Sequence, residues 1–256
     1  MSIVEYSVEG GVAVVRLNRP PVNALSTELG AALNKAFGKA EDPAVRALIL
    51  TGQPHFAAGA DIKGFQAAHE AGAITDDLAS ELVDAIWRLE ALAKPTIAAI
   101  FGYALGGGLE LSMGCDFRYM AEDAQVGQPE VKLGIMPGAG GTQRLVRIIG
   151  FQKAKEMVYS GRFVPAAEAL ELGLADMVFP AGELLDRSME DAQRWASGPT
   201  VALGTSKRAL IGGLGLPLRE AMEVERRAFL DCFWSDDARE GVAAFIEKRK
   251  ATFEGS

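Results

Sequence analysis

The chain has 256 residues, of which 49% are hydrophobic and 23% are charged, a balance typical of a folded globular protein. Its 34 acidic and 26 basic side chains give a formal net charge of −8, which argues against a non-specific nucleic-acid binder or a basic membrane-surface protein. The cysteines Cys115 and Cys232 and the histidines His55 and His69 do not stand at metal-ligand spacing, so no metal site is predicted. No signal-peptide pattern opens the chain and no apolar run reaches roughly 18 residues, which predicts a cytoplasmic protein without membrane contact.

The predicted elements alternate between strands and helices along most of the chain. Alternating β-branched segments around a Gly10–Gly11 turn predict an N-terminal hairpin, and Ser26 is expected to cap the helix after it. Further strands are expected at residues 47–51, 96–101, 117–121, 124–127 and 174–179, and further helices at 76–92, 109–114, 142–149, 151–160 and 165–172. From about Ala181 onward the pattern is helical. This order predicts an α/β core, which we place at residues 1–195, and a helical region at 196–256.

Three stretches that follow predicted strands are rich in small residues. The first, Phe56–Asp61, lies in a segment from 53 to 75 that is too long for a plain connector and is a candidate functional loop. The second, Gly102–Glu110, carries three successive glycines before a helix, where unpaired backbone amides can bind an oxygen that becomes anionic. The third joins Gly127–Glu130 to the cluster Pro137–Gly141. Taken alone, the first stretch is equally well explained as a tight, well-packed loop.

Two glutamates in these stretches are candidate acid/base groups. Glu110 falls in the first turn of the predicted helix, where a glutamate commonly does no more than complement the helix dipole. Glu130 lies among mostly apolar and small residues, which favour a raised pKa and suit a general acid. In isolation, a surface glutamate after a proline in a turn is the simpler interpretation of Glu130.

Other glycine-rich motifs are excluded by single residues. The stretch Gly138–Gly140 does not open a GxGxxG motif because Gln143 stands at the sixth position. Gly38–Lys39 is followed by Ala40, where a phosphate-binding loop needs serine or threonine, and no GxSxG nucleophile motif is present. Backbone amides without a nucleophile, combined with two carboxylates, favour the stabilisation of an enolate while protons or water move.

With these residues the sequence resembles the crotonase superfamily, most closely the enoyl-CoA hydratases. The resemblance runs in order along the whole chain, and its ordered set of motifs is far more specific than any one of them. The matching stretches are Asn18–Pro20, Asn23–Leu25, Phe56–Lys63, Lys94–Pro95, Ala98–Ala99, Gly102–Glu110, Cys115–Asp116, Gly127–Glu130, Pro137–Leu145, Glu240–Gly241 and 244–249.

The resemblance implies a spiral of repeated ββα units with a C-terminal helical region that forms trimers, usually paired into hexamers. It implies that the amides of Ala60 and Gly107 form an oxyanion hole for a thioester carbonyl, and that Glu110 and Glu130 are the catalytic acid/base pair. The positions that it implies for binding acyl-CoA are Ala58, Asp61, Ile62, Lys63, Gly138 and Lys248. No metal or redox cofactor is expected, because coenzyme A is part of the substrate.

The resulting prediction is a hydratase that adds water to a trans-2-enoyl-CoA. Family members that keep only the second carboxylate tend to isomerise double bonds, so the presence of both favours hydration. The alternatives are an enoyl-CoA isomerase, a hydratase for a branched or aromatic acyl-CoA, and a non-catalytic acyl-CoA- or RNA-binding member of the fold. The acidic balance argues against the RNA-binding alternative. Pro21–Val22 replaces a loop in which many hydratases carry a cation near the CoA phosphates, which predicts a weaker contact there.

Overall fold

The computed structural model describes residues 2–61, 64, 66, 70 and 80–256. Ile62, Lys63 and His69, with the first residues of the helix predicted at 76–92, lie outside the described residues. The described part of that helix, α3, runs over Ser80–Ala91.

Two sheets form the centre of the molecule. The larger has the order β1-β2-β3-β5-β7-β10 and the smaller the order β4-β6-β8-β9. The larger sheet consists of β1 (Val4–Glu9), β2 (Val12–Leu17), β3 (Ala47–Gly52), β5 (Thr96–Ile100), β7 (Phe117–Ala121) and β10 (Met177–Phe179). The smaller consists of β4 (Ala57–Ala58), β6 (Tyr103–Leu105), β8 (Gln125–Gly127) and β9 (Phe163–Pro165). Only the pairs β1–β2 and β8–β9 are antiparallel among the described ladders.

From β3 to β8, successive strands alternate between the two sheets. The pairs β3 and β4, β5 and β6, and β7 and β8 each give their first strand to the larger sheet and their second to the smaller. Every residue of β3 and β5 is buried, as expected for parallel strands covered on both faces. This winding confirms the predicted α/β fold of repeated strand–strand–helix units, and it stacks the ends of β4, β6 and β8 beside one another.

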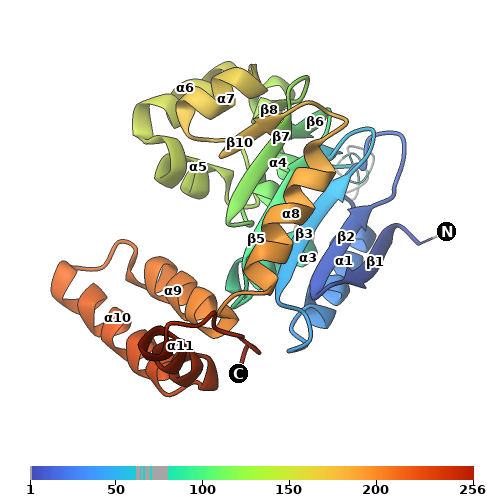
Figure 1. Ribbon diagram of the computed structural model, residues 1–256. Helices are drawn as coiled ribbons and strands as arrows, with labels where there is room; N and C mark the ends of the chain where they lie inside the picture. Colours follow the sequence, from blue (N-terminus) through green and yellow to red (C-terminus); the bar gives the residue numbers. More distant parts are fainter. Residues whose placement is uncertain (1, 62–63, 65, 67–69, 71–79) are drawn as a thin grey trace.

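Helices cover both faces of the larger sheet (Figure 1). Helix α8 (Leu184–Ala196) lies across one face of this sheet, while α1 (Thr27–Lys39) and α3 pack together on the opposite face. The Ser26 hydroxyl accepts a hydrogen bond from the Leu29 amide, which confirms the predicted cap. The other helices within the described residues of this part are α4 (Gly107–Ser112), the 3₁₀ helix η2 (Pro129–Leu133), α5 (Gly141–Ile149), α6 (Phe151–Ser160) and α7 (Ala166–Leu172).

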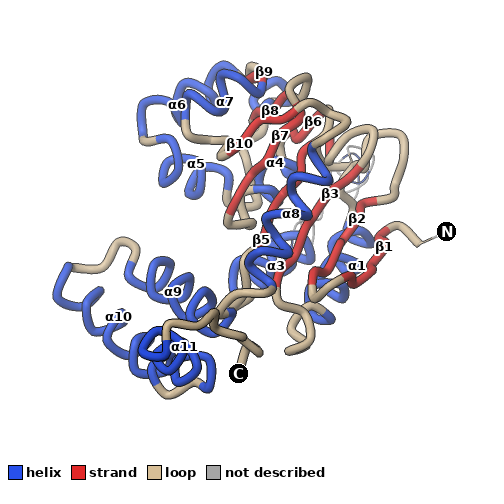
Figure 2. Tube along the Cα trace, in the orientation of Figure 1, coloured by secondary structure: helices blue, strands red, loops and turns tan. Residues whose placement is uncertain are grey.

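The C-terminal helices stand apart from the sheets (Figure 2). They are α9 (Thr200–Gly213), α10 (Leu218–Phe233) and α11 (Asp236–Glu247), and they pack mainly on one another. No residue of α10 is buried in the single chain. Large apolar side chains are exposed on α10, α11 and the turn between them, among them Leu218, Met222, Phe229, Trp234, Phe245 and Ile246. Among the described helices, none is both long enough and apolar enough to cross a bilayer.

Candidate active site

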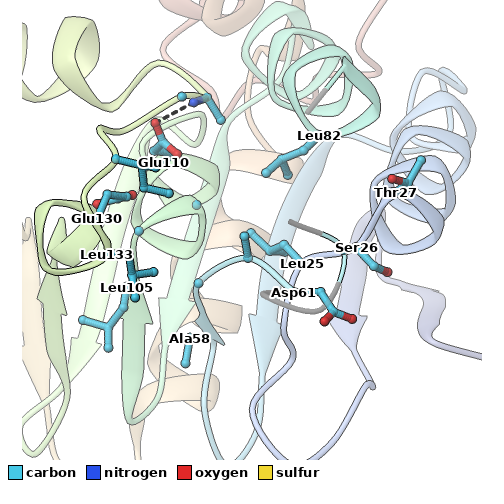
Figure 3. A pocket seen from close by; sticks show the side chains of 18 of the residues that line it. Leu25, Ser26, Thr27, Ala58, Asp61, Leu82, Leu105, Glu110, Glu130 and Leu133 are labelled. Atoms are coloured by element: carbon cyan, nitrogen blue, oxygen red, sulfur yellow. Dashed lines mark hydrogen bonds between the residues drawn. The ribbon is translucent and has the colours of Figure 1, made fainter. Parts of the chain in front are cut away.

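A cavity of about 540 Å³ opens where the ends of β4 and β6 meet the first turn of α4. Its walls come from the segment before α1, the start of α3, the helix η2 and the turn that precedes α5. Figure 3 shows Glu110 and Glu130 on one wall, with Leu25 and Leu82 across from them. The two predicted carboxylates therefore share one site, although they come from different repeats of the spiral.

Glu110 is held by the backbone of the turn before α5. Its Oε1 accepts hydrogen bonds from the amides of Ala139 and Gly141, both at 2.7 Å. The residue is 2% exposed, and this burial raises the pKa of the carboxyl. The two amides and the charge of Arg144 oppose that rise because they stabilise the carboxylate. A Cβ at position 141 would lie 2.9 Å from Oε1, so this position has room only for a glycine.

Glu130 is half-buried on η2, and its carboxyl faces the glycine turn of α4. Desolvation by burial raises the pKa of Glu130 to about 7, and the nearby charge of Glu110 adds to the rise. Gly106 has a positive φ of 55°, and a Cβ there would lie 2.8 Å from Glu130 Oε1. Glycine at this position therefore adopts the positive φ without strain and leaves room for the Glu130 carboxyl. The simpler interpretation, a surface glutamate in a turn, is wrong.

The backbone around Ala60 leaves its amide directed away from the neighbouring segment. Leu25 and Ala60 form a parallel bridge in which Leu25 N–H donates to Gly59 O at 2.9 Å and Asp61 N–H donates to Leu25 O at 2.8 Å. In such a bridge the N–H and C=O of the central residue point away from the partner. The Ala60 amide is therefore not used by this bridge.

The amide of Gly107 stands next to that segment. Gly107 is the first residue of α4, so its N–H has no acceptor within the helix. The preceding residue, Gly106, lies close to Gly59: a Cβ added to Gly106 would be only 3.7 Å from the Gly59 Cα. The two loops are therefore neighbours. Ala60 and Gly107 both line the cavity. Two backbone amides from different loops, one of them at the positive end of α4, therefore lie in the wall of the cavity without a partner in their own bridge or helix.

The predicted binding residues fall into two groups. Ala58, Asp61 and Gly138 line the cavity, and a Cβ on Gly138 would meet no atom within 4 Å. Lys248 lies at the end of α11 with a left-handed backbone and is not among the residues that line this cavity. Ile62 and Lys63 are outside the part of the chain that the structure describes.

Two residues with contacts in the site are absent from the sequence-based prediction. Arg19 lines the cavity, where it donates to Asp61 Oδ2 at 2.6 Å and to the Ala24 carbonyl at 2.9 Å. Its place in the motif Asn18–Pro20 was the available signal. The side-chain amide of the fully buried Gln128 lies against the Glu130 carboxyl, and with its nitrogen turned toward an ionised Glu130 it donates to both oxygens, at 2.9 and 3.1 Å.

The arrangement is suited to proton transfer beside a polarised carbonyl. Two carboxyls with different hydrogen-bond partners face one cavity, and two amides stand ready for an oxygen that gains negative charge. Both cysteines are free, and Cys115 is buried. Within the described residues, no group of three or more histidine, cysteine, aspartate or glutamate side chains is arranged to hold a metal ion.

Comparison with known proteins gives consistent matches over the whole chain. The sequence model of the family "Enoyl-CoA hydratase/isomerase" matches residues 7–256. The chain is 42% identical over 247 residues to a short-chain-enoyl-CoA hydratase from Clostridium acetobutylicum, covering 94% of each chain. It is 43% identical over 255 residues to a crotonyl-CoA hydratase from Syntrophomonas wolfei, covering 96% of this chain and 95% of that protein. A crystal structure of an enoyl-CoA hydratase from Bacillus anthracis matches with a TM-score of 0.90 at 37% identity, covering 100% of both chains.

Proposed function

The chain belongs to the enoyl-CoA hydratase/isomerase family, and we propose that within it this protein adds water across the 2,3 double bond of a trans-2-enoyl-CoA. The observation that carries the proposal is the pair Glu110 and Glu130 on one cavity beside the amides of Ala60 and Gly107. The product is the 3-hydroxyacyl-CoA.

The reaction divides between the two carboxyls. The Glu110 carboxylate takes a proton from water while the water oxygen bonds to C3 of the substrate. The electron pair of the double bond moves toward the thioester, whose oxygen becomes an enolate oxygen held by the amides of Ala60 and Gly107. Each such donor contributes about 3–4 kcal/mol to stabilising this charge. The proton of the Glu130 carboxyl then passes to C2, which completes the addition.

The surroundings of the two groups support this assignment. Two backbone amides and the charge of Arg144 favour the ionised form of Glu110, which a base requires. Burial raises the pKa of Glu130 to about 7, which favours the protonated form that an acid requires. Environments that separate the protonation of two carboxyls in this way set their roles.

The acyl-CoA itself needs contacts beyond the reacting atoms. We propose that Ala58, Asp61 and Gly138 contact it, and that Arg19 supplies a positive charge near the mouth of the cavity. Lys63 and Lys248 are proposed to meet the phosphates. No further cofactor is proposed, because each step above uses only water, the substrate and the protein.

We propose that the protein assembles as a homotrimer or a homohexamer through residues 196–256. The support is the exposed apolar surface of α10 and α11, which includes Leu218 and Phe245, 76% and 85% exposed in the single chain. Light scattering after size-exclusion chromatography tests this. A mass of three or six chains is expected, and a monomer at micromolar concentration contradicts it.

The activity is tested with crotonyl-CoA, whose conjugated thioester absorbance disappears on hydration. The wild-type protein is expected to be active, and Glu110→Gln and Glu130→Gln are each expected to lose roughly 10²–10⁴-fold in kcat. Glu122→Gln, an exposed glutamate after β7, is the control and is expected to keep full activity. Full activity in either active-site variant contradicts the mechanism. Conversion of a 3-enoyl-CoA without hydration of crotonyl-CoA identifies an isomerase instead.

A further inference from the structure

Arg144 lies on α5, one turn after the glycine that contacts Glu110, and its guanidinium group joins two elements. Nη2 donates to Glu90 Oε2 at 2.8 Å and Nε donates to Glu90 Oε1 at 3.2 Å, so the ion pair with α3 is bidentate. Nη1 donates to the Ala139 carbonyl oxygen at 3.2 Å. The side chain is 12% exposed, and its guanidinium also lies 5.0 Å from the centre of the Trp87 ring.

The Ala139 residue connects this guanidinium to the catalytic base. Its carbonyl accepts from Arg144, while its amide donates to Glu110 Oε1 at 2.7 Å. Gly140, the next residue, has a φ of 104°, and a side chain there would overlap the guanidinium. The turn is therefore shaped around Arg144 on one side and around Glu110 on the other.

Helix α3 gives this contact a second connection to the site. Leu82, near the start of α3, lines the cavity, and Glu90 lies two turns later on the same helix. The bidentate pair thus ties the turn before α5 to the helix that forms part of the cavity wall. A displacement of the turn by 1 Å is enough to reduce a rate by about 10²-fold.

We propose that Arg144 is a positioning residue for Glu110, which, anchored by Glu90, holds the Pro137–Gly141 turn so that its two amides stay on the carboxylate. This inference rests on the proposed hydratase reaction, in which Glu110 is the base. Arg144 itself does not touch the reacting atoms.

The charged groups around Glu110 make the proposal measurable through pH. Arg144 on α5 lowers the pKa of Glu110, the charge of Glu130 on η2 interacts with Glu110 on the same wall of the cavity, and Glu90 on α3 partly neutralises Arg144. Loss of the Arg144 charge raises the pKa of Glu110 and shifts the acid limb of the kcat profile to higher pH. Loss of the Glu90 charge leaves Arg144 uncompensated and shifts that limb to lower pH.

The experiment measures crotonyl-CoA hydration for Arg144→Gln, Arg144→Lys, Glu90→Gln and the double variant Arg144→Gln/Glu90→Gln. Arg147→Gln is the matched control, since Arg147 is an exposed arginine on the same helix. We expect Arg144→Gln to lower kcat roughly 10- to 10²-fold with KM within about threefold of wild type. We also expect the acid limb to move in opposite directions in Arg144→Gln and Glu90→Gln, and the losses in the double variant to be less than additive.

The outcomes separate this inference from the proposed function. An inactive wild-type protein overturns the hydratase reaction and the inference with it. An active wild-type protein with Arg144→Gln indistinguishable from Arg147→Gln in kcat and pH profile overturns the inference alone. If Arg144→Gln does not fold, Arg144→Lys decides, because it keeps the charge but loses the bidentate pair. A lowered kcat with an unmoved acid limb supports the proposal, and a wild-type kcat overturns it.

Discussion

The carboxyls of Glu110 and Glu130 line one cavity, but the helices that carry them differ in burial. All six residues of α4, Glu110 included, are buried, and the helix begins at a glycine turn packed against β4. No residue of η2 is fully buried, and Glu130 stands at the second position of this short 3₁₀ helix. The same residue type is therefore fixed by backbone amides in one case and left half-exposed in the other.

This difference teaches how one cavity can hold an acid and a base of the same chemical type. Burial raises the pKa of both groups, but Glu110 receives two amide hydrogen bonds and the field of Arg144, which favour its carboxylate. Glu130 has the charge of Glu110 beside it, which favours its protonated form. Because the two groups interact, their protons leave in two steps that belong to the pair.

The largest effect on the difference between the two carboxyls is expected from a substitution that disturbs the backbone amides donating to Glu110. In Gly141→Ala, the new Cβ would lie 2.5 Å from the Gln128 side-chain amide, 2.9 Å from Glu110 Oε1 and 2.9 Å from the Pro137 Cβ, so the amide, the carboxylate or the turn must shift. We expect a loss in kcat of about 10²-fold, measured with crotonyl-CoA. Gly182→Ala is the control, because no atom lies within 4 Å of a Cβ there. Equal activity of the two variants would mean that the close packing at Gly141 is unimportant.

The pH dependence of the wild-type activity tests the different protonation states assigned to Glu130 and Glu110. Hydration needs Glu130 protonated, so kcat/KM is expected to fall above a pKa of about 7, by about tenfold per pH unit. It needs Glu110 ionised, so activity also falls on the acid side, at a pH above the ordinary carboxyl value because burial raises the pKa of Glu110. Initial rates between pH 4.5 and 9 test both limbs. A profile that stays flat from pH 6 to 9 contradicts the assignment of Glu130 as the acid.

Local signals in the sequence predict much of this architecture. The hairpin β1–β2, the Ser26 cap and the continuous apolar runs of β3 and β5 depend on residues close together in the chain, and all are observed. The short elements β6, β9 and η2 are not predicted, because three to five residues carry too little periodicity. The pairing of β6 and β9 in the smaller sheet comes from the winding of the chain.

The supporting contacts of the site could not be read from the sequence for the same reason. Arg19 meets Asp61 across 42 positions, and Arg144 meets Glu90 across 54. Neither pair is marked by spacing, so only the fold brings them together. Glu110 and Glu130 were identified through the family resemblance, since the residue pattern alone favoured an ordinary first-turn glutamate and a surface glutamate.

The smallest expected effect concerns stability. A carboxyl whose pKa is raised to about 7 in the folded state keeps a proton that the unfolded chain has already released, so stability falls as pH rises from about 4.5 to 7. Glu130→Gln removes this penalty and should stabilise the protein at pH 8 by about 1–2 kcal/mol, less than the full shift implies because the cavity admits water. Urea unfolding at pH 8 and pH 5, at one fixed protein concentration, should show a smaller gain in the free energy of unfolding at the lower pH.

The control is Glu122→Gln, an exposed position, which should show no such gain. A destabilised Glu130→Gln at pH 8 would mean that the hydrogen bonds from Gln128 outweigh the cost of burying the charge.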